Sequence, residues 1–505
     1  MDFIDPDQHR KHVIMVFVGY FLVGLAVLIA TLILLYVVRG YVYKKGEVVQ
    51  NGLIFVSSQP HPADIYLDGQ LDKHQTNSRF NLQEGSYDME LRRDGYRTWQ
   101  RKIQIIGGKV VHFDYPFLFP VQLTSSDIKT YAAAPQSASS SLDRRWLLVA
   151  PDPVPTDVKS AALSTVEFEL FDLKDPKRVQ PSTLALPKTV ITPSTAKQSW
   201  QYVEWADDNK HVVLKHIYGK DYEYILLDRT APAAAVNLTK TFGMNPTELQ
   251  LINRKYDQYY LYDAKTQTIF KASLKNPQPV DYLDHVLAYK SYGNDMMLYA
   301  AAAGPDSDGT VKIKLQQGDN SFTITAFPAG THYVVQLAKY DGDMYMVVGA
   351  ASQDKVYVYK NPLAQIADQN LKHAVPVHTL RLPSPDYVSF SDNARFIMAE
   401  HGTHFGVYDA EDDQTFSYNV PTYPLDKPQL HATWMDGNRL TYVSHGSVVV
   451  FDYDDNNEQV LVPSRPAYLP MFDPSYRTLY TLMPMKDDPT KTVLAATSLL
   501  TPADQ

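Results

Sequence analysis

The sequence predicts an all-β protein that begins with a single apolar helix. One apolar run covers residues 13–38, and no later segment shows helical periodicity over a comparable length. Short β-prone segments follow, and many of them are separated by turn pairs that end in glycine. Further along the chain, a strand, an acidic turn and a second strand recur at regular intervals. Together these patterns indicate a repeating β architecture behind one N-terminal helix.

Residues 13–38 form the predicted transmembrane helix, preceded by a short tail at residues 1–12. A span of about 20 apolar residues crosses the hydrocarbon core of a bilayer, so this run is long enough to cross with some tilt. A buried core helix would alternate polar and apolar faces, and a signal peptide has a shorter apolar region followed by a small-residue cleavage site. The lipid bilayer is therefore the first predicted partner, contacted through residues 13–38.

The charges beside the apolar run do not settle its orientation. Two basic residues precede it and three follow it: Arg10, Lys11, Arg39, Lys44 and Lys45. This count slightly favours a cytoplasmic C-terminal side. The absence of cysteine from all 505 residues favours the opposite side, because an exported bacterial protein without disulfide handling is expected to avoid cysteine. We therefore expect a single-pass protein of the cell membrane whose C-terminal domains are extracytoplasmic.

Composition also excludes several functions. The formal net charge is −9 and the basic residues do not cluster, which argues against nucleic acid as a partner because phosphate binding needs a concentrated basic surface. Without cysteine the chain has no thiolate metal site and no cysteine nucleophile. Its 35 tyrosines favour exposed strands and binding surfaces.

After a linker at residues 39–51, residues 52–120 are predicted to form a small β-sandwich. Strand-like segments lie at residues 53–57, 64–67, 86–92, 99–106 and 110–115. The turn pairs between strands are Asp68-Gly69, Glu84-Gly85, Asp94-Gly95 and Gly107-Gly108. Each pair ends in glycine, which accepts the positive φ that tight hairpin turns require.

Three motifs in this segment resemble those of PEGA domains. They are the stretch from Ser58 to Gly69, then Leu82-Gln-Glu-Gly85-Ser-Tyr87, and then Arg93-Asp-Gly95-Tyr96-Arg-Thr-Trp99. The sequence departs from the family where Pro60-His61-Pro62-Ala63 replaces Pro-Glu-Gly-Ala, and at Thr76-Asn77, where the family usually has Thr-Pro. The resemblance implies a small extracytoplasmic β-sandwich near a membrane anchor or cell wall, and it implies no catalysis.

Residues 121–505 carry the repeat. Its clearest copies are Trp205-Ala-Asp-Asp-Asn-Lys, Phe390-Ser-Asp-Asn-Ala-Arg, Trp434-Met-Asp-Gly-Asn-Arg and Phe472-Asp-Pro-Ser-Tyr-Arg, with weaker copies at Leu251, Tyr289 and Leu337. Successive copies lie roughly 38 to 53 residues apart, which is the range of four-stranded propeller blades. We predict a β-propeller of seven or eight blades, with eight slightly favoured; unrelated hairpins in one or two β-sandwiches are the alternative. The turns are similar to those of TolB-type and WD-repeat propellers.

The last repeat lacks room for a fourth strand, so residues 121–124 are expected to complete it. Such a closure joins the two ends of the propeller and leaves no free sheet edge.

The sequence contains no recognisable catalytic motif. It lacks the Gly-x-Ser-x-Gly elbow, the P-loop, the dinucleotide fingerprint and the His-Glu-x-x-His helix. We therefore predict that the protein is not an enzyme and binds no cofactor. His401 and His404 have metal-like spacing, but no third ligand is evident.

Four residues are weak candidates for calcium ligands: Asp452, Asp454, Asn456 and Glu458. Their oxygen-bearing side chains are spaced two apart, as in the first half of a calcium loop. The glycine at the sixth position and the distal glutamate of such a loop are missing. A solvated connection between strands is the alternative.

The leading functional hypothesis is a membrane-anchored, extracytoplasmic binding, adhesion or scaffold protein whose propeller face contacts a protein or glycan. The Pro-rich insertion at residues 151–165 is a candidate contact, because loops on propeller faces commonly carry binding. One alternative is a structural subunit of a multi-protein cell-envelope assembly, in which Ala26 and Ala30 allow close helix contacts. A hydrolase or lyase is a less favoured alternative, and it requires two facing carboxylates in the central channel.

Overall fold

The computed structural model divides the chain into two units, Met1–Gln122 and Leu123–Gln505. It describes residues 6–38, 41–44, 47–150, 165–302, 309–367, 373–420, 425–427 and 430–504. Most of the insertion predicted at residues 151–165 lies outside these ranges. The sequence had placed the start of the propeller at residue 121, next to the division between the units.

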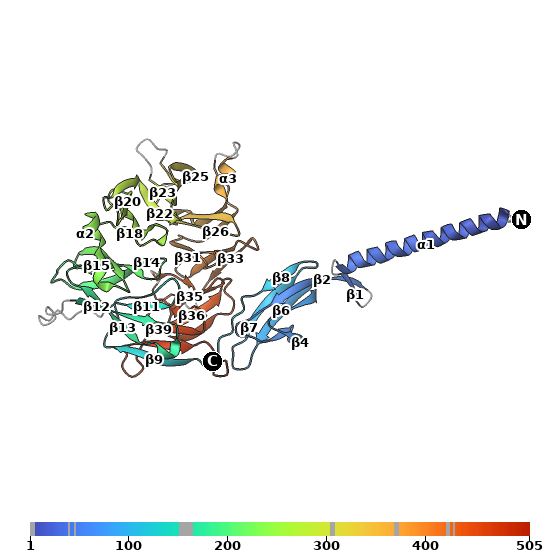
Figure 1. Ribbon diagram of the computed structural model, residues 1–505, viewed down its shortest axis with the longest axis horizontal. Helices are drawn as coiled ribbons and strands as arrows, with labels where there is room; N and C mark the ends of the chain where they lie inside the picture. The colour runs from blue at the N-terminus through green and yellow to red at the C-terminus, as the bar shows by residue number, and fades with distance from the viewer. Residues whose placement is uncertain are drawn as a thin grey trace. The chain divides into compact units, whose positions relative to one another are not determined.

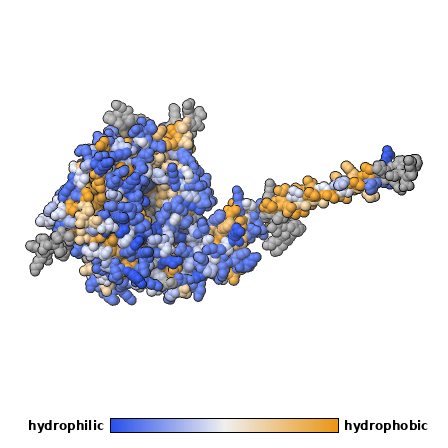
Figure 2. All heavy atoms as spheres, in the orientation of Figure 1, coloured by the Kyte–Doolittle hydropathy of each residue, from blue (hydrophilic) through white to orange (hydrophobic). Residues whose placement is uncertain are grey.

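Helix α1 (Pro6–Val38) contains the predicted transmembrane run and begins earlier than predicted. The tail expected at residues 1–12 is therefore helical from Pro6 onward; a proline is well tolerated in the first helical turn, where its missing N–H costs no hydrogen bond. Residues Arg10–Tyr36 are long and apolar enough to cross a membrane, and none of that stretch is buried against the rest of the chain. Figure 2 shows hydrophobic residues along most of this helix. The helix is thus a candidate membrane span.

The segment predicted as a linker, residues 39–51, contains regular structure among its described residues. Strand β1 (Tyr41–Lys44) pairs antiparallel with the first part of β2 (Glu47–Val56). Tyrosine and valine make up most of β1, and β2 contains Val48, Val49, Ile54, Phe55 and Val56; these residue types favour strands. Strand β2 continues from this hairpin directly into the first sheet of the following domain.

Two four-stranded sheets form the rest of the first unit. One contains β1, β2, β5 (Ser78–Gln83) and β8 (Val110–Phe113), in which β8 runs parallel to β2. The other has the order β4 (Gln70–Gln75), β3 (Asp64–Leu67), β6 (Gly85–Arg92), β7 (Trp99–Ile105). The buried side chains include Ile54, Val56, Met89 and Trp99. They form the core of the small β-sandwich that the sequence predicted.

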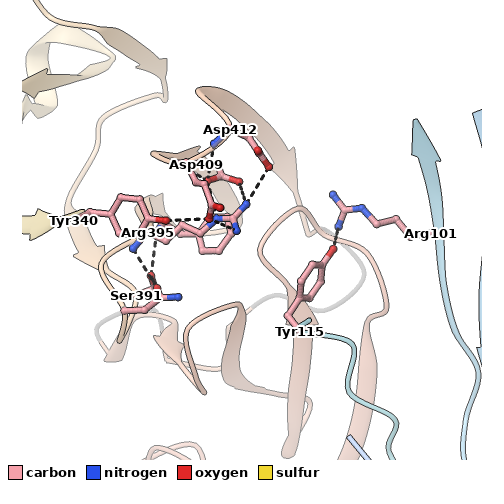
Figure 3. Close-up of polar contacts among 10 residues, drawn as sticks. Arg101, Tyr115, Tyr340, Ser391, Arg395, Asp409 and Asp412 are labelled. Atoms are coloured by element: carbon pink, nitrogen blue, oxygen red, sulfur yellow. Dashed lines mark hydrogen bonds and ion pairs between the residues drawn. The ribbon is translucent and has the colours of Figure 1, made fainter. Parts of the chain in front are cut away.

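Local contacts hold this sandwich in register. Asp68 and Gly69 both have positive φ between β3 and β4, as the predicted hairpin turn requires. The Asp68 carboxylate also accepts a hydrogen bond from the N–H of Asp88 on β6, at 2.9 Å. Arg101 on β7 donates to the hydroxyl of Tyr115 at 2.6 Å (Figure 3).

The second unit contains eight four-stranded sheets among its described residues, and in Figure 1 they follow one another around a ring. We number them as blades I to VIII. Blade I contains β10 (Ala138–Ser140), β11 (Trp146–Val149), β12 (Thr165–Asp172) and β13 (Pro181–Pro187). Blade II contains β14 (Gln198–Trp205), β15 (His211–Tyr218), β16 (Asp221–Asp228) and β17 (Val236–Asn237). Blade III contains β18 (Glu248–Leu251), β19 (Gln258–Asp263), β20 (Thr268–Ser273) and β21 (Val280–Leu283).

The remaining blades repeat the same antiparallel order. Blade IV contains β22 (Val286–Tyr292), β23 (Met296–Ala301), β24 (Thr310–Gln317) and β25 (Asn320–Pro328). Blade V contains β26 (Tyr333–Tyr340), β27 (Asp343–Ala350), β28 (Lys355–Lys360) and β29 (His378–Arg381). Blade VI contains β30 (Tyr387–Phe390), β31 (Phe396–His401), β32 (His404–Asp409) and β33 (Gln414–Asn419). Blade VII contains β34 (Thr433–Trp434), β35 (Arg439–Ser444), β36 (Ser447–Asp452) and β37 (Gln459–Pro463).

Blade VIII closes the ring. It combines β38 (Met471–Phe472), β39 (Thr478–Pro484) and β40 (Thr492–Ser498) with β9 (Thr124–Tyr131) from the start of the unit. The closing strand begins at Thr124, where the predicted one at residues 121–124 ended. A hydrogen bond of 2.8 Å between the hydroxyls of Ser125 and Thr497 joins the two ends of the propeller.

Short helices and apolar side chains complete the unit. The helices are α2 (Leu238–Phe242), α3 (Pro362–Ala367) and the 3-10 turns η2 (Pro176–Arg178), η3 (Pro232–Ala234), η4 (Ile252–Arg254) and η5 (Ala351–Gln353). Neighbouring blades share their cores: Phe168 of blade I packs with Trp200 and Trp205 of blade II, and all three are buried. The unit is therefore a β-propeller with eight blades among its described residues, the slightly favoured one of the two predicted numbers.

Candidate ligand-binding site

The acidic turns that the sequence singled out have a shared structural role. In blade VI, Arg395 lies in the turn after the first strand and forms a bidentate pair with Asp409, at the end of the third strand. Arg395 Nε donates to Asp409 Oδ1 at 2.9 Å and Nη2 donates to Oδ2 at 2.6 Å (Figure 3). Blade I repeats this geometry between Arg145 and Asp172, at 3.0 and 2.7 Å. The recurring motif thus ties two turns of one blade together.

Asp452, the first calcium candidate, occupies the equivalent position in blade VII. Its side chain is buried, 3.8 Å from Arg439 Nη1, and accepts a hydrogen bond from Asn457 Nδ2 at 2.8 Å. An arginine beside a carboxylate competes with a cation for that carboxylate, because both are positively charged. Asp452 therefore fits the structural pattern of the repeat.

The other candidates lie in the turn that follows, where Asn456 is exposed and Asp454 and Glu458 are partly buried. Asn456 Nδ2 donates to Asp454 Oδ2 at 2.8 Å. Burial and the neighbouring Asp454 raise the pKa of Asp455 to about 6, and burial and Asp455 raise the pKa of Glu458. In the described part of the chain, no three His, Cys, Asp or Glu side chains are arranged to hold a metal ion. Calcium binding at Asp452, Asp454, Asn456 and Glu458 stays a prediction.

His401 and His404 face each other across the β31–β32 hairpin. His401 Nδ1 lies 3.0 Å from a carboxylate oxygen of Asp386. This pairing accounts for His401 without a metal ion.

A polar pocket lies along the first strands of blades II to V. Its volume is about 570 Å³, and its walls come from β14, β18, β22 and β26, together with Lys215 of β15 and Tyr224 of β16. The first strands of neighbouring blades contact each other, β14 with β18 and β22 with β26. A cavity of a few hundred Å³ is the usual size of a small-ligand site.

The pocket lining includes Glu204 of β14 and Lys290 of β22. The N–H of Leu251 on β18 donates to Glu204 Oε2 at 2.9 Å, which links blades II and III. Burial raises the pKa of Glu204 and lowers that of Lys290, and each charge partly offsets the shift of the other. Both groups are therefore partly desolvated, and within the described structure they form no direct ion pair that would offset the cost.

A second pair of opposite charges lies between Lys215 and Glu248. Burial lowers the pKa of Lys215 and raises the pKa of Glu248. Lys215 Nζ lies 3.8 Å from the ring centroid of Tyr222 and 5.3 Å from that of Tyr224, positions in which an ammonium is attracted by the ring face. Each carboxylate of the pocket thus has an ammonium in its vicinity.

Tyrosine rings and amides supply the rest of the lining. Tyr202 has 36% of its surface exposed although its hydroxyl is engaged, accepting from the N–H of Trp205 at 3.0 Å. Burial raises the pKa of Tyr202 to about 12, so its phenol is neutral at physiological pH. Gln250 Oε1 accepts from the Ser291 hydroxyl at 3.1 Å. The lining therefore offers an aromatic ring in a fixed orientation beside hydrogen-bonding groups.

Sequence reasoning assigned none of these pocket residues to a binding site, although Tyr289 marks one of the weaker repeat copies. Charged residues inside strands were the signal that could have revealed the pocket. Glu204 directly precedes the repeat anchor Trp205, and Lys290 lies inside β22. Their convergence depends on ring geometry, which spacing along the chain does not reveal.

A second cavity of about 540 Å³ lies beside the closing strand β9. Ser125, Lys177 and Arg477 are among its lining residues. Its charged lining residues are two basic groups and one carboxylate, that of Asp175, so its charges are not balanced as they are in the pocket along the first strands.

Comparison with known proteins identifies the first domain. Residues 51–118 match the PEGA domain family. This confirms the resemblance in the predicted β-sandwich, despite the altered signature. Among curated proteins, none matches the sequence of the chain.

Solved structures similar to the chain are β-propellers of low sequence identity. The Dos1 propeller aligns with a TM-score of 0.42 and 10% identity, over 74% of this chain and 96% of that one. The β-propeller domain of Cps50 (Swd1) from Myceliophteria thermophila has a TM-score of 0.37 and 10% identity, over 66% and 97%. An oligogalacturonate lyase in complex with manganese has a TM-score of 0.37 and 9% identity, over 76% and 99%. At these values the comparisons carry no functional argument.

Proposed function

We propose that this protein is a binding module held at a membrane by α1, with its PEGA domain and propeller outside the cytoplasm and its ligand in the pocket along the first strands of blades II to V. The observation that carries this proposal is the pocket itself, which gathers opposite charges, amides and an exposed tyrosine from four blades. Buried charges cost free energy unless they are paired. A cavity lined by such groups is therefore better explained by a ligand than by stability.

The apolar helix and the PEGA domain support the location. Helix α1 has the length and hydropathy of a membrane span. PEGA domains are extracellular modules, and this one directly follows the helix in the sequence. The absence of cysteine from the chain agrees with export.

Membrane attachment is tested by expressing the full chain in a bacterial host and extracting the membranes with carbonate. We expect the wild-type chain to stay in the membrane pellet. Leu25→Arg places a charge near the centre of the helix, at a cost of about 2.5 to 3.5 kcal/mol, and shifts the protein toward the soluble fraction. The matched control Leu25→Phe keeps the position apolar and leaves the pellet fraction unchanged. Wild-type protein released by carbonate contradicts the anchor.

Orientation is tested by adding protease to intact cells and to permeabilised cells. We expect the domains after α1 to be cleaved in intact cells once the outer envelope is opened. Protection that is lost only on permeabilising the cell membrane places these domains in the cytoplasm and contradicts the proposal.

A second candidate function is hydrolysis or elimination in the same pocket. The specific observation is that two carboxylates, Glu204 and Glu248, line it and have a raised pKa. A carboxyl group with a raised pKa is suited to general acid catalysis. We favour binding because the Leu251 N–H holds one oxygen of Glu204. Turnover of a bound ligand that Glu248→Gln abolishes would favour the enzyme.

A further inference from the structure

The side chains that line the proposed pocket indicate which class of ligand it binds. This inference about the ligand rests on the proposed binding function. Within the described structure, the side chains of Glu248, Lys290 and Gln336 form no hydrogen bond or ion pair with the protein. Their polar groups are available to a ligand. Each comes from a different blade, so a ligand that contacts all three extends across blades III to V.

The charges of the lining balance. Lys215 and Lys290 carry positive charge, and Glu204 and Glu248 carry negative charge. A polyanion or polycation would meet as much repulsion as attraction in such a site. The balance favours a ligand without large net charge that presents many hydrogen-bonding groups.

The hydrogen-bonding groups of the lining suit a ligand that carries hydroxyl groups on adjacent atoms. The carboxylates only accept hydrogen bonds and the ammonium groups only donate them. The amides of Gln250 and Gln336 do both. A hydroxyl group donates one hydrogen bond and accepts others, so adjacent hydroxyls can satisfy this mixed lining. Peptide groups offer fewer donors and acceptors per unit volume than the adjacent hydroxyls of a sugar.

Tyr202 supplies the apolar surface that a sugar ring needs. Tyr202 lines the pocket and is partly exposed, and its hydroxyl is fixed by the backbone N–H of Trp205. The C–H face of a pyranose packs on such a ring, and an aromatic side chain fixed before binding loses little entropy on binding.

We infer that the pocket along the first strands of blades II to V binds a short, uncharged or zwitterionic saccharide segment. A sugar ring packs on the ring of Tyr202, and the sugar hydroxyls form hydrogen bonds with Glu248, Lys290 and Gln336. A volume of about 570 Å³ accommodates more than one sugar ring. The saccharide can be free or part of a larger glycan, because the pocket contacts only the segment it encloses.

The experiment applies the detergent-solubilised full chain to an array of neutral, amino and acidic oligosaccharides, with short peptides on the same array. Calorimetry on the retained compounds then gives affinities. We expect retention of at least one neutral or zwitterionic saccharide, and Tyr202→Ala weakens its binding about tenfold or more. Gln336→Ala also weakens binding, by a smaller factor.

Tyr256→Ala is the matched control. Tyr256 is exposed to a similar extent, 39%, and does not line the pocket, so we expect its replacement to leave the affinity unchanged. Circular dichroism and the melting temperature of each variant establish that it is folded before its affinity is used.

Each other outcome overturns the saccharide assignment in a distinguishable way. Retention of peptides alone, lost in Tyr202→Ala, refutes the saccharide and keeps the binding function of the pocket. Saccharide binding that Tyr202→Ala and Gln336→Ala leave unchanged places the saccharide elsewhere on the molecule. An array on which nothing is retained refutes both the saccharide and the proposed binding pocket, whatever the result of the membrane experiments.

Discussion

Blade II contains two glutamates with opposite environments. Glu223 on β16 is buried and has a full set of partners: the Thr192 N–H at 2.7 Å, the Thr192 hydroxyl at 2.6 Å, Asn237 Nδ2 at 2.7 Å and His216 Nδ1 at 2.9 Å. Burial alone would raise its pKa, but the hydrogen bonds outweigh burial and hold the pKa at about 2. Glu204 on β14 has one hydrogen bond, and its pKa is raised.

The difference separates a structural site from a candidate ligand site. A buried charge whose hydrogen-bonding positions are all occupied within the protein supports the fold and has little left for a ligand. A carboxylate beside a cavity with positions unoccupied contributes less to stability and more to recognition. The comparison therefore predicts that replacing Glu223 affects stability. The second glutamate of the pocket, Glu248, has no hydrogen bond in the described structure, so we expect its replacement to affect binding.

The largest expected effect is the loss of stability in Glu223→Ala. Removing one member of a buried, hydrogen-bonded charge network costs about 3 to 5 kcal/mol, because Thr192, His216 and Asn237 lose their shared acceptor. Thermal or denaturant unfolding of the propeller measures this. The control Glu248→Ala removes a solvent-accessible carboxylate that lines the cavity and forms no hydrogen bond in the described structure, so it is expected to change the free energy of unfolding by less than about 0.5 kcal/mol. Equal losses in the two variants would remove the distinction between the sites.

The second effect compares two copies of the repeated arginine–aspartate pair. In blade VI the carboxylate of Asp409 is 1% exposed, whereas in blade I the carboxylate of Asp172 is 39% exposed. We expect Arg395→Ala to lower the free energy of unfolding by about 2 kcal/mol, because it leaves Asp409 buried without its counter-ion. Arg145→Ala exposes its partner to water and is expected to have no measurable effect. Chemical denaturation of both variants checks the order, and a reversed order would refute burial as the cause.

The third effect is the pH dependence of stability. The pKa of Glu223 in the folded protein, about 2, lies below the ordinary value of about 4.3. Its stabilising contribution is therefore present above the ordinary pKa and is lost as pH falls from about 4.3 toward 2. Unfolding measured across this range should show a weaker dependence on pH in Glu223→Gln than in the wild type. An unchanged slope would mean that Glu223 is not the titrating group.

The smallest expected effect is that of Glu248 ionisation on the free energy of unfolding, and its sign is opposite to that of Glu223. The pKa of Glu248 is raised in the folded protein, so its ionisation disfavours folding once pH exceeds the ordinary value. Glu248→Gln should therefore leave stability at neutral pH equal to or slightly above that of the wild type. A clear decrease in the melting temperature at neutral pH would show that Glu248 has a structural role.

The sequence predicted the parts of the fold that depend on local patterns. Glycine-ended turn pairs revealed the PEGA sandwich, and the anchor Trp205 with its acidic turn revealed one blade of the ring. The β1–β2 hairpin was missed because its strands adjoin the transmembrane run, and a connection between two domains resembles a linker. The closing strand β9 was placed a few residues too early, since register follows from pairing with β40 and not from composition.

The candidate site could not be predicted in the same way. Tyr202, Glu248, Lys290 and Gln336 belong to four different blades, and each alone resembles a polar residue on a half-exposed strand. Their proximity results from the closure of the ring. The acidic turns were conspicuous in the sequence for the opposite reason, since Asp409 and Arg395 lie in one blade and recur with it.

The central claim is that unoccupied polar groups along the first strands of blades II to V bind a ligand, while the saturated network around Glu223 holds the blade. The most direct measurement is a paired titration and melting experiment on Glu248→Gln and Glu223→Gln, with the saccharide retained by the wild-type chain. For Glu248→Gln we predict an affinity weakened about tenfold and a melting temperature equal to or slightly above that of the wild type. For Glu223→Gln we predict an unchanged affinity and a lower melting temperature. A Glu248→Gln variant that binds like the wild type, or that melts at a temperature as low as Glu223→Gln, would contradict the account.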